Sequence, residues 1–167
     1  MDPKAERAHF VQVLRSFEDA QLVTRTPAGM LRSRPMAIAA VEDDGTAWFV
    51  TSHDTGKVFE IEEQAQVAVT FHSRARFASL SGRASIVDDR ARIRALWTEK
   101  WRPWVPGGPD TRDLVLIRVE PIVGEYWDQA GAKGLRHLWD VAKAAIAGER
   151  ADAVGEDGHV HGKVDLS

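Results

Sequence analysis

The sequence predicts a mainly β protein (α+β): an antiparallel β-barrel of six to seven strands with helices at its periphery. Short apolar stretches, alternating or rich in β-branched residues, recur along the chain and are separated by Gly, Pro and Asp. Asp44-Gly45 stands between two such stretches, which is typical of a tight β-hairpin. No glycine-rich nucleotide motif follows a strand, so a parallel βαβ architecture is not favoured.

The individual elements follow from capping residues and from hydrophobic periodicity. A helix is predicted from Pro3 to about Asp19, because Asp2 is a good N-cap and apolar residues then recur at helical spacing. The central hairpin comprises strands 36–41 and 46–52, and Pro35 places the start of its first strand at an edge or a bulge. The remaining predicted elements are strand 20–26, helix 54–63, strands 66–72 and 77–87, helix 88–97, an irregular loop over 100–111, strands 113–119 and 122–127 hinged at Pro121, and helix 135–147.

Length and composition bound the kind of protein. The 167 residues are enough for one domain with a full core, predicted over residues 1–147, followed by a Gly- and charge-rich tail over 148–167 that is expected to be loosely ordered. A net charge of −3 argues against a nucleic-acid-binding protein. No apolar segment suits a signal peptide or a membrane span, so a cytoplasmic location without membrane contact is expected.

Metal and thiol chemistry are not predicted. The chain has no cysteine, which excludes disulfides, thiolate ligands and a cysteine nucleophile. His159 and His161 have no third ligand nearby in the sequence, and such a pair in a tail is usually exposed. No residue is predicted to be catalytic, and His53 is only a weak candidate for a general acid or base.

Cationic and hydroxyl side chains are predicted to gather at the open end of the hairpin. Antiparallel pairing brings the start of its first strand next to the end of its second strand, where the 54–63 helix begins. Cations, hydroxyls and a helix N-terminus are the groups that bind a phosphate dianion. The sequence therefore favours a phosphate-bearing planar cofactor, although an arginine pair on a strand is more often a solvated face. The groups concerned are Arg32, Arg34, Thr51, Ser52, Thr55 and Lys57.

Other polar clusters receive a structural interpretation. Glu60, Glu62 and Glu63 are predicted to form the solvated face of the 54–63 helix rather than a carboxylate dyad. Ser52 and Ser81 lack the context of a nucleophilic serine, so a hydrolase triad is not supported.

Several motifs in a fixed order resemble the general stress protein branch of the pyridoxamine 5′-phosphate oxidase-like flavoproteins. The resemblance covers roughly residues 5 to 130 and implies a split β-barrel that binds FMN, as a homodimer with each FMN at the subunit interface. The matching segments are L-R-S-R-P-M, W-F-V-T-S-H-D-T-G-K-V-F-E-I, S-L-S-G-R-A, W-V-P-G-G-P-D, V-G-E-Y-W-D and G-K-V-D-L.

The resemblance also assigns roles to individual positions. Arg34 corresponds to the arginine that contacts the FMN phosphate, with Thr55 and Lys57 completing that site. Pro35 and Met36 would pass along the flavin ring, and Val50 and Thr51, beside Ser52, would reach the ring and the ribityl chain. Trp127 corresponds to the aromatic residue that approaches the flavin from the second subunit.

Two departures argue against pyridoxamine phosphate as the substrate. Ala39 stands where the oxidases carry a substrate-binding lysine, and Lys133-Gly134-Leu135 replaces their Arg-Leu-His. Three interpretations remain: an FMN-dependent oxidoreductase acting on an unknown small molecule, a flavin-binding stress protein without turnover, and a cofactor-free barrel that works through protein contacts. A deazaflavin or a haem in place of FMN is a further variant.

Overall fold

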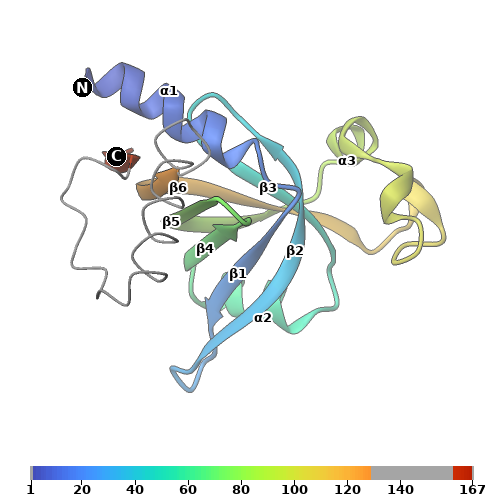
Figure 1. Cartoon of the computed structure of the whole chain (residues 1–167). Coiled ribbons are helices and arrows are strands. Elements are labelled where there is room, and N and C mark those ends of the chain that lie inside the picture. Colours follow the sequence, from blue (N-terminus) through green and yellow to red (C-terminus); the bar gives the residue numbers. More distant parts are fainter. Residues whose placement is uncertain (1, 129–159, 167) are drawn as a thin grey trace, which may run out of the picture.

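The computed structural model describes residues 2–128 and 160–166. These residues form a strongly twisted antiparallel barrel with α1 and α3 at its sides and α2 beside β1 and β2 (Figure 1). The elements are α1 (Pro3–Leu14), β1 (Asp19–Arg25), β2 (Leu31–Val41), β3 (Ala47–Ser52), α2 (Gly56–Glu63), β4 (Gln66–His72), β5 (Arg76–Val87), α3 (Arg90–Leu96), the short 3₁₀ helices η1 (Glu99–Trp101) and η2 (Gly108–Asp110), β6 (Leu114–Asp128) and β7 (Val160–Asp165).

The barrel closes through β6. The strand order is β3-β2-β1-β4-β5-β6-β7, and the additional pairing of β3 with β6 joins six strands into a ring. One edge of β6 pairs with β5 along its length, while the other edge is divided: Leu114–Val119 pair with β3, and Val123–Asp128 pair with β7. The predicted antiparallel barrel of six to seven strands is confirmed.

The predicted central hairpin is also confirmed. Its turn spans Glu42 to Gly45, and Gly45 adopts φ +89°, a conformation that residues with a side chain rarely adopt. The Glu42 N–H donates to the Thr46 carbonyl at 2.9 Å, and the Asp44 side chain accepts from the Thr46 N–H at 2.8 Å.

Several predicted elements have different bounds in the structure. The first strand of the hairpin, predicted over 36–41, spans Leu31–Val41 as β2. The strands predicted on either side of Pro121 are one strand, β6, because a bulge at Ile122 opposite Ser81–Gly82 absorbs the irregularity and Pro121 still pairs with Gly82. The first helix ends at Leu14 instead of about Asp19, and Asp19 already begins β1.

Of the predicted tail, 148–167, the structure describes residues 160–166, and these include a strand. Val160–Asp165 forms β7 on β6, and the absence of a side chain on Gly162 makes room for Tyr126, whose ring atoms lie 2.3–2.5 Å from the place of a Cβ. The predicted helix 135–147 and His159 lie outside the described residues.

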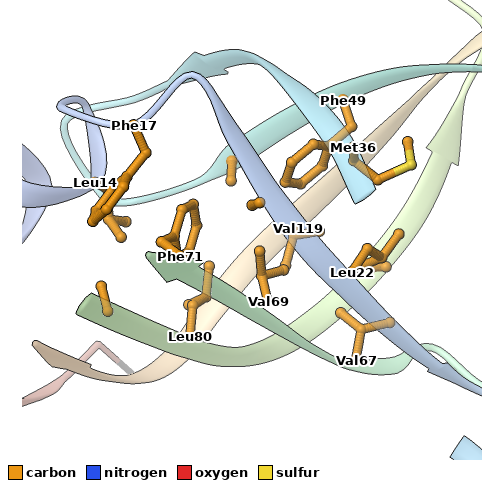
Figure 2. Packing of buried hydrophobic residues seen from close by; sticks show 14 of the residues in the cluster. Leu14, Phe17, Leu22, Met36, Phe49, Val67, Val69, Phe71, Leu80 and Val119 are labelled. Carbon is orange, nitrogen blue, oxygen red and sulfur yellow. The ribbon is translucent and has the colours of Figure 1, made fainter. Parts of the chain in front are cut away.

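The core fills the barrel and extends under α1. Figure 2 shows side chains of β1 to β6 packed together with Leu14 and Phe17, which lie in and just after α1. A second, smaller apolar cluster lies on the outer face of β3 and β6 under α3 and is formed by Trp48, Ile93, Leu114 and Leu116. β3 is therefore covered on both faces, and this fixes the position of its last residues, where the candidate site begins.

Candidate functional site: a polar barrel end where β2 and β3 separate

β2 and β3 are hydrogen-bonded partners only near their turn. In the described residues, their register covers Ile38–Val41 against Ala47–Phe49, with a bulge between Ile38 and Ala40. Toward Leu31, β2 keeps β1 as its neighbour but has no recorded pairing with β3, and Pro35 lies in this one-sided stretch opposite Gln21. The prediction that Pro35 lies at an edge or a bulge is confirmed, since it lies at an edge. The backbone of β2 beside Pro35 is not paired with β3.

Arg32 and Arg34 lie on the inner face of the barrel. Directly opposite residues of antiparallel strands share a face, and the register pairs Arg34 with Leu22 and Arg32 with Thr24. Leu22 is fully buried in the core, so the row of inward side chains changes from apolar to polar toward the end of the barrel. The alternative that this arginine pair forms a solvated face does not hold for Arg34, whose side chain is only 19% exposed.

A buried carboxylate holds these arginines. Glu60 of α2 is 3% exposed and accepts hydrogen bonds from Arg34 Nη2 at 2.8 Å and from Arg32 Nη1 at 3.1 Å. The hydroxyl of Thr24, also buried, donates to the same carboxylate and accepts from Arg34 Nη1. The expectation that Glu60 lies on a solvated helix face is wrong, whereas Glu62 and Glu63 are exposed as predicted.

Hydrogen bonds keep Glu60 ionised in this position. Burial acts to raise the pKa of Glu60, but the hydrogen bonds from Thr24 and Arg34 and the charges of Arg34 and Arg32 outweigh burial and hold the pKa below its usual value. The site therefore contains a fixed negative charge among its cations.

Lys57 lies on the opposite side of this group, near β3. Its Nζ donates to Thr51 Oγ1 at 2.9 Å, and Thr51 faces inward next to the core residue Phe49 in the alternation of β3. Burial and the positive charge of Arg34 lower the pKa of Lys57, partly opposed by Glu60. Arg34 and Lys57 are thus close enough to repel each other, and an anion between them would relieve that repulsion.

The lowered pKa of Lys57 predicts a pH-dependent stability. Between this pKa and the unfolded value of about 10.4, the unfolded chain binds more protons than the folded chain, so the free energy of unfolding rises with pH. We expect Lys57→Met to remove this rise in ligand-free protein, measured by urea unfolding from pH 7 to 10.5, while Lys4→Met on the exposed face of α1 keeps it. Parallel curves for wild type and Lys57→Met would contradict this assignment.

The start of α2 adds backbone donors beside the cations. α2 begins at Gly56, and the hydroxyl of its N-cap Thr55 makes no capping bond but donates to the Ser52 carbonyl at 2.9 Å. A Cβ placed on Gly56 would lie 3.9 Å from Arg32 Nη1, so this helix end and Arg32 are close neighbours. First-turn N–H groups not capped by a side chain are suited to an anion.

The other residues predicted near the ring have distinct surroundings. Pro35 is exposed, and Val50 is partly buried against the second apolar cluster. The Met36 side chain belongs to the core, so only its backbone is available to a ligand on the β2 edge. The hydroxyl of Ser52 donates to Asp113 and is therefore not directed at the cations. His53 is exposed, with its Nδ1 3.5 Å from Asp54.

Trp127 lies at the other end of the barrel. It follows Val115, the partner of Thr51, by twelve residues along β6, a length measured along the strand of at most about 40 Å. Its ring stacks on His161 of β7 with centroids 4.9 Å apart. Trp127 of one chain therefore does not join the Arg34–Lys57 group of the same chain, and its approach to the flavin from a second subunit stays a prediction.

Thr24 and Glu60 are the site residues that the sequence analysis missed. Thr24 could have been found, because the alternation of buried Ala20 and Leu22 along β1 continues to it. Glu60 has no comparable signal, since its neighbours Glu62 and Glu63 are acidic and exposed. In the described residues no group of three or more His, Asp or Glu side chains suits a metal ion, and no helix has the length and apolar character needed to cross a membrane.

The topology defines the class of protein first. A closed six-stranded antiparallel barrel whose β2 and β3 separate at one end, with peripheral helices, is the split barrel that the sequence predicted. Residues 5–152 match the model of the family described as pyridoxamine 5′-phosphate oxidase like, and the chain belongs to this family.

Individual relatives agree with that assignment. Protein bli-3 of Neurospora crassa is 30% identical over 145 residues, which covers 79% of this chain and 68% of the relative. The crystal structure of a general stress family protein from Xanthomonas campestris is similar with a TM-score of 0.64 and 28% identity, over 79% of this chain and 92% of that chain. A pyridoxamine 5′-phosphate oxidase-related, FMN binding protein from Nostoc punctiforme shares the fold at a TM-score of 0.53 and 18% identity, over 77% of this chain and 83% of that chain.

Proposed function

We propose that this chain is an FMN-binding flavoprotein of the general stress protein type, and that it is an oxidoreductase in which FMN relays electrons to a small molecule. The observation that carries the proposal is the gathering at one end of the barrel of Arg34 and Lys57, both partly screened from water, with the more exposed Arg32 beside them. Partly desolvated cations bind a phosphate dianion through charge-assisted hydrogen bonds. Family membership and an FMN-binding protein of the same fold support FMN as the ligand.

Different residues would contact the phosphate, the ribityl chain and the ring of the cofactor. Arg34, Lys57 and the start of α2 at Thr55 would hold the phosphate, and Thr51 would reach the ribityl chain. The exposed β2 edge at Pro35, with Val50 on β3, would border the isoalloxazine ring with backbone groups. Bound FMN supplies the redox chemistry, while the protein orients the ring and sets its electrostatic surroundings.

A second copy of the chain would complete the site. Trp127 is remote from Arg34 within one chain, so we propose a homodimer in which the partner's Trp127 approaches the flavin. Pyridoxamine phosphate is not the proposed substrate, because Ala39, at the β2 bulge, offers no cation.

Colour and released ligand test the proposal. Purified protein should be yellow with flavin absorbance, and mass spectrometry of the ligand released on denaturation should identify FMN. Colourless protein that takes up no FMN on reconstitution would contradict FMN binding, and release of a deazaflavin or a haem would correct the cofactor.

A flavin-binding stress protein without turnover is the second candidate. It is favoured by the lack of a placed acid or base among the described side chains near the site, where His53 is exposed and Lys57 is engaged by Thr51. Anaerobic mixing with NADH or NADPH separates the two candidates: bleaching of the flavin colour supports the oxidoreductase, and unchanged colour with both donors supports the non-catalytic protein.

A further inference from the structure

We infer that Glu60 is the positioning residue of the phosphate site: it holds Arg34 and Arg32 in place and sets the net charge of the site to match a phosphate monoester dianion. The inference rests on the proposed function, since it concerns the same site. It goes beyond that function by giving a role to a carboxylate that a simple anion site would not contain.

The contacts of Arg34 define its orientation before any ligand arrives. Its Nη2 donates to Glu60 at 2.8 Å and its Nη1 donates to Thr24, which in turn donates to Glu60. Both terminal nitrogens of the guanidinium are therefore tied to buried groups. A guanidinium has five N–H donors, so donors remain for an anion while the plane of the group is fixed. Preorganised donors bind more tightly because less conformational freedom is lost on binding.

Glu60 also lowers the net positive charge of the site. Arg32, Arg34 and Lys57 carry three positive charges, and the carboxylate reduces the sum to two. A phosphate monoester carries close to two negative charges at neutral pH. The carboxylate thus removes an excess of positive charge and limits the repulsion between Arg34 and Lys57 in the ligand-free protein.

Two roles for Glu60 predict opposite effects of its neutralisation. If Glu60 only competes with the ligand for the arginines, Glu60→Gln increases the positive charge and tightens phosphate binding. If Glu60 positions Arg34, the amide can no longer accept from both arginines, and phosphate binding weakens despite the added charge. The geometry points to the second effect, because Glu60 is 3% exposed and anchored by Thr24 and cannot follow the arginines to a ligand.

The test compares FMN with riboflavin, which lacks the phosphate. Both ligands are titrated into ligand-free wild type, Glu60→Gln and the control Glu62→Gln, an exposed residue of α2, with flavin fluorescence as the readout. The ratio of the riboflavin Kd to the FMN Kd reports the contribution of the phosphate. We expect Glu60→Gln to reduce this ratio by about 10-fold or more, with riboflavin affinity unchanged, and Glu62→Gln to retain the wild-type ratio.

Thr24→Val provides a second variant in case Glu60→Gln does not fold. It keeps the carboxylate and the side-chain volume but removes the hydroxyl between Glu60 and Arg34, and we expect the ratio to fall by about 3-fold. A ratio that is unchanged or increased in the folded variants, with wild type preferring FMN, overturns the positioning role and leaves the proposed function intact. A wild type without preference for FMN overturns the proposed function, and the inference with it.

Discussion

Replacing Arg34 with alanine is expected to lower the free energy of unfolding by about 3 kcal/mol, because the variant leaves Glu60 buried with one of its two cationic partners removed. Arg32 remains 3.1 Å from Glu60 but is largely exposed, so it compensates only in part. The same variant should lose the preference for FMN over riboflavin. Urea unfolding and flavin titration measure the two effects.

A double variant separates the buried charge from a general loss of packing. Arg34→Ala with Glu60→Gln removes the uncompensated charge, so this variant should be more stable than Arg34→Ala alone by about 1–2 kcal/mol. Arg25→Ala is the matched control, since Arg25 is exposed at the end of β1, and its loss should change stability by less than about 0.5 kcal/mol. Equal stability of Arg34→Ala and wild type would show that Glu60 does not depend on Arg34.

Gly124→Ala is expected to destabilise the barrel by about 1–3 kcal/mol, because the core next to Gly124 is already full. A Cβ at Gly124 would lie 2.3 Å from Phe10 Cζ and under 3 Å from two further ring carbons, and Phe10 is fully buried between α1 and β6. Gly56→Ala is a suitable control for stability, since the nearest atom to its Cβ would be 3.9 Å away.

Replacing the ring of Phe10 with the smaller side chain of leucine should relieve this clash. Phe10→Leu alone removes buried contacts, but in the background of Gly124→Ala it should cost less or even restore stability. The coupling energy from the four thermal or urea unfolding experiments should therefore be at least about 1 kcal/mol. Additive effects would mean that α1 moves away from β6 instead of being held against it.

Local signals predicted most of the fold. Asp44-Gly45 specified the central hairpin because a two-strand reversal needs a residue with positive φ, and Gly45 adopts it. The continuity of β6 was not predicted, because Pro121 ordinarily ends a strand and only the opposite strand shows that a bulge accommodates it. β7 was not predicted either, since a short segment such as Val160–Asp165 becomes a strand only through the free edge of β6.

The sequence predicted the cations of the candidate site but not the buried carboxylate that partly neutralises them. Arg34 and Lys57 were identified because the predicted hairpin places both segments at its open end. In the structure β2 and β3 separate there, but the two cations are still close enough for the charge of Arg34 to lower the pKa of Lys57. Glu60 was assigned to solvent because its burial depends on contacts with β1 and β2, which are remote in the sequence. Long-range pairing of polar groups leaves no periodic signal, so this part of the site required the structure.

The central claim is that the cations at the barrel end hold the phosphate of FMN. Its most direct test is a calorimetric titration of ligand-free wild-type protein with FMN and, separately, with riboflavin under the same conditions. Charge-assisted contacts from Arg34 and Lys57 predict that FMN binds at least about 100-fold more tightly than riboflavin. Equal affinities for the two flavins would contradict the account.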